Sequence, residues 1–290
     1  LEDIAAAIGT PEEAVERLLI TCQALDLVGK KDQKYINAED AEKYLVRGKS
    51  TYFGDYLVYQ AKDEYDTWKN VASALRPPKE LYYALKEDAS AARRFTVAGY
   101  NASISLAFKV AKEFDFSRYK LFLDLGGGSG CYSIAAATLH PKLKALVFDF
   151  PNVLEVTKEF INQHNLSDRI STQPGDFMEN DFPSGADLAA FITNLQSYNP
   201  EKKIILARKA YDALRPGGTL LIIDYMLLDD KSGPLDPAFM NLAQYSMRGS
   251  GGQVFAGAEY CECLTKVGFI DAKARWLLPH MLGLAQGNKP

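Results

Sequence analysis

The chain has 290 residues, of which 47% are apolar, 24% charged and 11% aromatic, and its formal net charge is −4. A chain of this length can bury a core without disulfides or metals, and this composition excludes a disordered tail and a coiled coil. The slight acidic excess argues against a dedicated nucleic-acid-binding protein, which usually carries a basic face.

Apolar runs in the chain are short. The run Leu220–Ile223, for example, is broken within a few residues, so we expect no membrane-spanning segment. The N-terminus lacks the basic and apolar pattern of a signal peptide. Three histidines leave little room for a histidine-built metal site, and the four cysteines follow no metal-binding spacing. We therefore expect a cytoplasmic protein with reduced thiols and no bound metal.

Residues 1 to about 48 predict a small helical module. The segment Thr10-Pro11-Glu12-Glu13 has the pattern of a helix start, with threonine as the N-cap and proline at the first helical position. Residues 25–31 and 34–37 then predict a short hairpin. Helices followed by a hairpin are typical of a winged helix. Because the chain is acidic overall, we favour dimerisation or packing over DNA binding for this module.

Residues 51–118 are rich in tyrosine and predict helices. Tyr52, Tyr56 and Tyr59 recur at i, i+4 and i+7, which would place them on one helix face. Such a stripe is more often a packing surface than a ligand contact. We assign residues 1–116 to a domain that forms dimers and closes over the substrate, and residues 117–290 to a second domain.

From residue 120 the pattern changes to strands that alternate with helices. Five apolar runs predict strands: Lys120–Leu125, Leu143–Phe150, Ile170–Gln173, Leu188–Thr193 and Thr219–Asp224. The main helices are expected at residues 131–139, 152–165 and 200–214. Alternation of this kind predicts an α/β domain with a mostly parallel sheet.

A glycine cluster, Gly126-Gly127-Gly128-Ser129-Gly130, lies between the first of these strands and the following helix. Glycines at such a turn let a ligand approach the backbone and the N–H groups at the helix start. A dinucleotide-binding fingerprint would require a further glycine at position 131, which is Cys131. The cluster therefore predicts a cofactor site of another kind.

Acidic residues follow the strands on this side of the predicted sheet. Asp149 ends the second strand, where a carboxylate can accept both hydroxyls of a ribose. Asp176 follows the third strand, where it could accept the amino group of an adenine while Phe177 packs on the ring. Because the carboxyl ends of parallel strands face one crevice, these residues predict a nucleoside-containing cofactor.

Several motifs follow one another in a recognisable order: Leu123–Gly130 (LDLGGGSG), Val147–Val153 (VFDFPNV), Asp168–Ile170 with Gly175–Phe177, and Leu214–Gly218 (LRPGG). In order and spacing they resemble the S-adenosylmethionine-dependent methyltransferases of the plant-caffeate and hydroxyindole O-methyltransferase type. The similarity covers nearly the whole chain.

The resemblance implies a Rossmann-like methyltransferase sheet of seven mostly parallel strands behind an N-terminal winged-helix domain that forms a homodimer. It implies S-adenosylmethionine as the cofactor, a small-molecule acceptor, and no metal, nucleic-acid or membrane partner. The residues that it places at the cofactor are Gly126, Gly128, Asp149, Phe150, Asp176, Phe177 and Asn194.

The residues that carry proton transfer in this family are absent from the chain. The family's histidine lies in a Leu-His-Asp-Trp segment, which matches Leu195-Gln196-Ser197-Tyr198 here. An amide such as that of Gln196 cannot take a proton at any useful pH. The family's helper glutamate matches Val254. General-base catalysis is typically worth about 10² to 10⁴ in rate, so its loss requires a chemical explanation.

Three explanations remain open. One is a nucleophile that carries no proton, as in a thioether, a tertiary amine or an activated carbon. The second is a chain that binds the cofactor without methylating, and the third is another base, with Tyr100, Tyr245 and Asp236 as candidates. We favour S-methylation of a thioether acid such as 4-methylthio-2-hydroxybutyrate, the step that leads to dimethylsulfoniopropionate. Positioning and desolvation would suffice for it, and tyrosine faces would stabilise the new sulfonium.

The acceptor is expected between the cofactor and the helix that spans residues 236–248. The residues predicted to contact it are Met240, Gln244, Arg248 and Asn101, with Gln196, Tyr245 and Tyr100 as the catalytic candidates. Arg248 could clamp a carboxylate of the acceptor with two hydrogen bonds. A nicotinamide-dependent dehydrogenase and a winged-helix DNA regulator are weaker alternatives.

Overall fold

The computed structural model describes residues 1–32, 34–69, 84–248 and 252–290, with residues 66, 67, 84 and 245–248 described for the backbone alone. The chain forms two compact units, Leu1–Val58 and Tyr59–Pro290. Each unit is described by itself.

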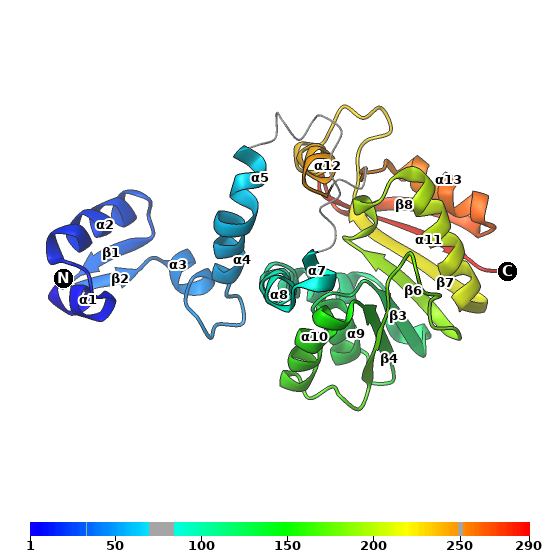
Figure 1. Ribbon diagram of the computed structural model, residues 1–290, viewed down its shortest axis with the longest axis horizontal. Helices are drawn as coiled ribbons and strands as arrows, with labels where there is room; N and C mark the ends of the chain where they lie inside the picture. The colour runs from blue at the N-terminus through cyan, green and yellow to red at the C-terminus, as the bar shows by residue number, and fades with distance from the viewer. Residues whose placement is uncertain (33, 70–83, 249–251) are drawn as a thin grey trace. The chain divides into compact units, whose positions relative to one another are not determined.

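The first unit is a small helical module with a hairpin (Figure 1). Its elements are α1 (Glu2–Ile8), α2 (Glu12–Ala24), β1 (Val28–Lys31), β2 (Lys34–Asn37), α3 (Glu39–Tyr44) and most of α4 (Gly54–Tyr59). The two strands pair antiparallel, so the predicted hairpin is confirmed. A small apolar cluster of Ala5, Val15 and Leu19 holds α1 and α2 together.

Two local predictions for these helices were wrong. Helix α2 has Pro11 as its N-cap and no side-chain capping bond, because the Thr10 hydroxyl turns back toward the Ile8 carbonyl, 3.4 Å away. Tyr52 lies before α4 rather than on it, since the helix begins at Gly54. The expected stripe is therefore limited to Tyr56 and Tyr59.

The second unit contains a seven-stranded sheet in the order β5-β4-β3-β6-β7-β9-β8. The strands are β3 (Leu121–Leu125), β4 (Lys144–Asp149), β5 (Ile170–Pro174), β6 (Ala186–Ile192), β7 (Leu214–Tyr225), β8 (Ile270–Leu278) and β9 (Leu282–Asn288). The first five in the sheet are parallel, and β9 runs antiparallel to both of its neighbours. The predicted α/β class with a mostly parallel sheet is confirmed.

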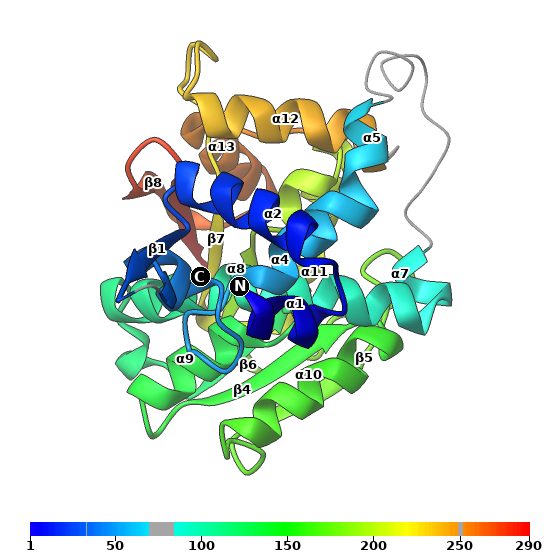
Figure 2. The same cartoon turned by 90° about the vertical axis from the view of Figure 1, so that its left-hand side faces the viewer.

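Helices cover both faces of this sheet (Figures 1 and 2). The longer ones are α8 (Ala89–Glu113), α9 (Cys131–Leu139), α10 (Pro151–Gln163), α11 (Pro200–Ala213), α12 (Leu235–Arg248) and α13 (Gly257–Val267). Short helical segments are η1 (Gln60–Glu64), α5 (Tyr65–Lys69), α7 (Ala84–Glu87), η2 (Phe116–Arg118) and η3 (Leu195–Ser197).

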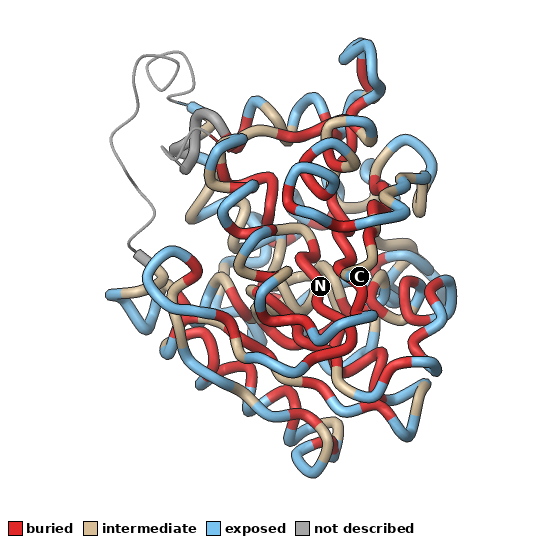
Figure 3. Tube along the Cα trace, turned by 90° about the vertical axis from the view of Figure 1, so that its right-hand side faces the viewer, coloured by how far each residue is buried: buried red, intermediate tan, exposed pale blue. Residues whose placement is uncertain are grey.

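The core lies in two layers, one on each face of the sheet. Alternate residues of each strand point to opposite faces, so Phe122 joins the layer under α8, α9 and α10, while Leu123 joins the layer under α11 and α13. The central strands are buried on both faces (Figure 3); all seven residues of β6 are buried. This explains why the parallel strands read as continuous apolar runs.

The carboxyl ends of β3, β4 and β6 meet at one edge of the sheet, where the strand order reverses. In open α/β sheets this is where ligands bind. Helix α8 packs against α9 and α10 within the same compact unit, although the sequence analysis assigned it to the N-terminal domain. No described helix has the length and apolar character needed to cross a bilayer.

Candidate active site

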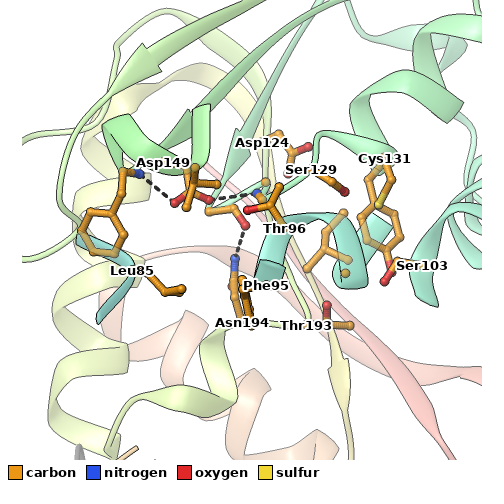
Figure 4. Close-up of a pocket in the computed structure, with 18 of the residues that line it drawn as sticks. Leu85, Phe95, Thr96, Ser103, Asp124, Ser129, Cys131, Asp149, Thr193 and Asn194 are labelled. Atoms are coloured by element: carbon orange, nitrogen blue, oxygen red, sulfur yellow. Dashed lines mark hydrogen bonds between the residues drawn. The ribbon is translucent and has the colours of Figure 1, made fainter. Parts of the chain in front are cut away.

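A cavity opens at this edge of the sheet, between the glycine loop and α8 (Figure 4). Leu85 and Asp149 lie toward one end of the close-up, and Cys131 and Ser103 lie toward the other. The lining residues used below are Leu85, Phe95, Thr96, Gly99, Ser103, Asp124, Gly126, Gly128, Asp149, Phe150, Phe177, Thr193 and Asn194. Of the residues predicted at the cofactor, all except Asp176 line this cavity.

The glycine loop has a backbone that other residues rarely adopt. Gly126 and Gly128 have φ values of 65° and 55°, in the left-handed region that favours glycine. A Cβ on Gly126 would lie 2.5 Å from Nδ2 of Asn194, whereas one on Gly128 would meet no atom within 4 Å. Gly126 is therefore needed for close packing under the cavity, and Gly128 leaves its backbone open to a ligand.

The Asp149 carboxylate is held by two backbone N–H groups. Gly128 N donates to Oδ2 at 2.9 Å and Phe150 N donates to Oδ1 at 2.7 Å. Burial nevertheless raises the pKa of Asp149 to about 6. With both oxygens oriented in this way, the carboxylate can accept the paired hydroxyls of a ribose, as predicted from its place after β4.

Asp124, the penultimate residue of β3, was not predicted as a site residue. Its Oδ2 accepts a hydrogen bond from Ser133 at 2.7 Å, and its buried Oδ1 has no partner among the described residues. Burial, helped by the nearby charge of Asp149, raises the pKa of Asp124 to about 7. Its position directly before the glycine loop was the sequence signal that could have identified it.

The charge of the cavity suits a cationic ligand. The described lining includes the carboxylates of Asp124 and Asp149 and no lysine, arginine or histidine. Asn194, also in the lining, donates from Nδ2 to the carbonyls of Leu125 (2.6 Å) and Gly126 (3.1 Å), and its buried Oδ1 has no partner among the described residues. S-adenosylmethionine, with a sulfonium and an ammonium group against one carboxylate, fits this set of oxygens.

Helix α8 closes the cavity with Phe95, Thr96, Gly99 and Ser103, and the Thr96 hydroxyl is buried without a partner among the described residues. Tyr100 faces away from it. Its ring stacks on Phe160 at 3.9 Å, and its hydroxyl contacts Nε2 of His164 at 2.6 Å. Burial raises the pKa of Tyr100 to about 12. This geometry does not support Tyr100 as a base.

Asp176 and Asn101 also lie outside the described lining. Oδ2 of Asp176 pairs with Nζ of Lys86 at 3.1 Å, and its Oδ1 accepts from Met178 N at 2.8 Å, while Gly175 and Phe177 on either side line the cavity. These contacts leave lone pairs on both carboxylate oxygens, so the bond from Asp176 to adenine stays a prediction. Asn101 is half-buried, and its Oδ1 has no partner among the described residues.

Gln196, at the family's histidine position, is 3% exposed and lies in η3. Its backbone N–H donates to Oδ2 of Asp224 at 2.9 Å, and its Nε2 donates to the Thr193 carbonyl at 2.9 Å. The side-chain Oε1 is buried without a partner in the described structure. Gln196 is not among the residues that line the described cavity, whereas Thr193, which it contacts, and Asn194 do line it.

Helix α12, predicted to contact the acceptor, packs against η3. Gln244 is buried and donates from Nε2 to Sδ of Met240 at 3.1 Å on its own helix, leaving its Oε1 without a described partner. Met240 packs on the apolar cluster that contains Val254. The side chains of Tyr245 and Arg248 lie outside the described residues, so their predicted roles stay predictions.

A buried charged cluster beneath η3 was missed in the sequence. Lys203 and Asp224 are both fully buried. The Tyr260 hydroxyl donates to Oδ2 of Asp224 at 3.0 Å. Nζ of Lys203 donates to the Gln253 carbonyl and lies 3.6 Å from the centre of the Phe255 ring. Burial lowers the pKa of Lys203 and raises that of Asp224. A lysine inside a helix pattern looks solvent-exposed, so the sequence carries little signal for this cluster.

The comparisons with known proteins agree with the fold and the site. A model of the O-methyltransferase domain matches residues 58–270, and the chain therefore belongs to this family of S-adenosylmethionine-dependent methyltransferases. It resembles the human N-acetylserotonin methyltransferase solved with S-adenosylmethionine, with a TM-score of 0.87 and 27% identity over 99% of this chain and 86% of that one.

Three characterised relatives extend this likeness. The chain is 30% identical to a 3-hydroxy-5-methyl-1-naphthoate 3-O-methyltransferase of Streptomyces sahachiroi, over 99% of this chain and 85% of the relative. It is 31% identical to acetylserotonin O-methyltransferase of Bos taurus (94% and 82%) and 30% identical to L-tyrosine C(3)-methyltransferase of Streptomyces lavendulae (92% and 76%).

These relatives give no support to the thioether acceptor expected from the sequence. They are named for methyl transfer to oxygen or carbon, and an N,N-dimethyltransferase of Streptomyces rimosus is also similar, at 30% identity. The loss of a base was therefore an insufficient reason to choose sulfur. Among the described residues, no cluster of three or more His, Cys, Asp or Glu could hold a metal ion.

Proposed function

We propose that the protein transfers a methyl group from S-adenosylmethionine to the hydroxyl oxygen of a small aromatic acceptor. The observation that carries the cofactor is the cavity at the glycine loop, whose described lining presents carboxylate and amide oxygens and no cationic side chain. Support for the acceptor comes from the relatives, which are named for aromatic acceptors.

The chain's own residues would hold the cofactor as follows. Asp149 accepts the ribose hydroxyls, Phe150 and Phe177 pack around the adenine, and the backbone of Gly126 and Gly128 lies along the methionine part. Asp124 and Asn194 turn their unpartnered oxygens toward the cationic groups. When bound, S-adenosylmethionine supplies an electrophilic methyl group and leaves as neutral S-adenosylhomocysteine.

The proton of the acceptor hydroxyl cannot be removed here by the histidine base that the family resemblance implies. Gln196 has an amide in place of the base, Val254 is fully buried in an apolar cluster, and none of the three histidines lines the described cavity. We propose that the acceptor hydroxyl loses its proton to solvent and that the protein contributes positioning and desolvation. Tyr245 and Asp236 stay candidates for a substitute base.

The acceptor contacts proposed are Met240, Gln244, Asn101, Tyr245 and Arg248. The unpartnered Oε1 of Gln244 would accept a hydrogen bond from the acceptor. A homodimer through the N-terminal winged-helix region, a lid role for residues up to 116 and a cytoplasmic location stay predictions.

The test measures S-adenosylhomocysteine release with a panel of small acceptors: substituted phenols, anilines and thioether acids. Turnover with phenols, faster for the more acidic ones, is expected. Turnover confined to thioethers would restore the S-methylation hypothesis, and turnover confined to anilines would move the acceptor atom to nitrogen. An Asp149→Ala variant, expected to lose the cofactor, serves as the control for background release.

A further inference from the structure

Thr193, which lines the cavity, has a strained backbone. Its φ is 52°, in the left-handed region, where a β-branched residue is a rare outlier. Such strain persists where the surroundings hold it, and it clusters at ligand sites. Its N–H donates to the Ile223 carbonyl at 2.8 Å, so this residue is tied to β7.

The carbonyl of Thr193 is held from the other side by Gln196. Nε2 of Gln196 donates to this carbonyl at 2.9 Å, closing a short ring over three residues of chain. Because that bond requires the NH₂ group, the Oε1 atom must face elsewhere, and it is buried without a partner among the described residues. A buried amide oxygen without a hydrogen bond lowers the stability of the fold, so the bond that the same amide donates to Thr193 must contribute enough to offset that cost.

Thr193 passes its position on to Asn194. The Asn194 side chain crosses to the glycine loop, where Nδ2 donates to the carbonyls of Leu125 and Gly126 at 2.6 and 3.1 Å. A Cβ on Gly126 would lie 2.5 Å from this amide, so Asn194 packs directly against the glycine backbone. The backbone at Thr193 therefore determines where the asparagine oxygen meets a ligand.

The Gln196 turn is itself anchored from below. Oδ2 of the fully buried Asp224 accepts the backbone N–H of Gln196 at 2.9 Å and the hydroxyl of Tyr260 at 3.0 Å. Lys203, also fully buried, donates to the Gln253 carbonyl. The neighbouring Gly252 packs closely on the turn, since a Cβ added to it would lie 2.8 Å from the Gln196 carbonyl. Asp224 thus fixes the turn on its N–H side, and Lys203 holds the segment that packs closely against the Gln196 carbonyl.

We propose that Gln196 is a positioning residue for the cofactor: anchored by Asp224 and Lys203, its side-chain amide holds Thr193 in the left-handed conformation and so places Asn194 on the glycine loop. The residue that stands where relatives carry a base would then act on cofactor affinity rather than on the acceptor's proton. This inference rests on the proposed cofactor site.

The experiment compares Gln196→Met with the unmodified protein by calorimetric titration of S-adenosylhomocysteine. The substitution keeps the size of the side chain and removes its donor, so we expect affinity to fall about tenfold while the melting temperature changes little or rises. A merely structural role would lower the melting temperature instead. Gln286→Met is the matched control, since that half-buried glutamine lies on β9 and outside the described lining of the cavity, and the affinity of this variant should be unchanged.

Two further variants separate the possible outcomes. In an Asn194→Ala background, Gln196→Met should have little additional effect on affinity, because its action runs through Asn194. Without any ligand, Thr193→Gly should raise the melting temperature less in Gln196→Met than in the unmodified protein, because the strain that glycine relieves is present only while Gln196 holds Thr193 at positive φ.

Unchanged affinity in Gln196→Met, or equal effects of Thr193→Gly in both backgrounds, would overturn the inference. Absence of S-adenosylhomocysteine binding by the unmodified protein would contradict the proposed cofactor site instead, and the ligand-free comparison would still decide whether Gln196 holds Thr193.

Discussion

Two carboxylates line the described cofactor cavity, and the loss of Asp149 should reduce cofactor affinity most. It is held by the N–H groups of Gly128 and Phe150 and would accept two ribose hydroxyls. Hydrogen bonds to a charged group are worth about 1.5–3 kcal/mol each, so Asp149→Ala should weaken S-adenosylhomocysteine binding by roughly 100-fold or more. Calorimetry measures this directly. The exposed Asp181→Ala is the matched control, and equal affinities in both variants would refute the assignment.

Asp124 predicts a dependence of stability on pH. Burial raises its pKa in the fold to about 7, from an ordinary value of 3.8. The folded form therefore prefers the neutral carboxyl. Its stabilising contribution is fully present below pH 3.8 and is lost as the pH rises through 7.

Asp124→Asn removes this penalty. Relative to the unmodified protein, the variant without ligand should gain at most about 4 kcal/mol in free energy of unfolding at pH 8 and much less at pH 5. Urea unfolding at both pH values measures the difference. A gain of the same size at both would show that Asp124 does not titrate in this range. The variant should also bind S-adenosylmethionine more weakly, since a negative charge is lost.

The chemical role of a residue could be predicted from the sequence better than the orientation of its side chain. Gln196 was recognised as a non-base from its chemistry alone. The direction of Tyr100 was not predictable, because the stack on Phe160 and the contact with His164 fix it. Asp176 meets Lys86 across 90 residues of chain, and no local pattern indicates such a pair.

At the scale of elements, α7 joins the cofactor cavity to the loop after β5. Leu85 lines the cavity, and Nζ of the neighbouring Lys86 pairs with Asp176 at 3.1 Å and Glu179 at 2.8 Å. Because these pairs are partly exposed, each is worth about 0–1 kcal/mol.

We expect Lys86→Met to speed S-adenosylhomocysteine release by up to about fivefold, and high salt to narrow the difference from the unmodified protein. Stopped-flow dissociation measures both effects. Lys158→Met, which breaks a pair within α10, is the control and should leave release unchanged. The same rate in Lys86→Met and in the unmodified protein would show that the α7 pairs do not hold the cavity closed.

Elements were predictable where burial was complete. Strands β3, β4 and β6 and the second half of β7 are mainly apolar runs because helices cover both their faces, and they were located from sequence. The edge strand β5 was located too, although only Ile170 in it is buried. The two antiparallel strands after α13 were not. β8 is only half-buried, and β9 contains Gly283 and Gly287, whose missing side chains make room for Met226 and Phe269.

At the scale of the whole molecule, the domain start predicted at residue 117 does not coincide with the start of the second compact unit. That unit begins at Tyr59, because α8 packs on α9 and α10 beside the sheet. A helix that covers a sheet from upstream looks, in sequence, like part of the preceding helical region. The boundary between the two units is determined by which elements pack against one another, not by the composition of the sequence.

The first unit leaves apolar side chains of α2 exposed. Leu18 and Ile20 are 54% and 58% exposed, and such surfaces commonly mark contacts between chains. If this unit forms the predicted homodimer, Leu18→Glu with Ile20→Glu should shift a dimer toward monomer without changing S-adenosylhomocysteine affinity. Light scattering after gel filtration measures the mass. An unmodified protein that is monomeric, or a variant that stays dimeric, would contradict an interface on α2.

The most direct test of the account is the pH dependence of kcat for phenols of different acidity, at saturating S-adenosylmethionine. Gln196 leaves no histidine base at the expected place, so the ionisation that limits the rate should belong to the acceptor. The account predicts that the inflection of kcat moves with the acidity of the phenol. An inflection at the same pH for every acceptor would show that a group of the protein takes the proton, and would contradict it.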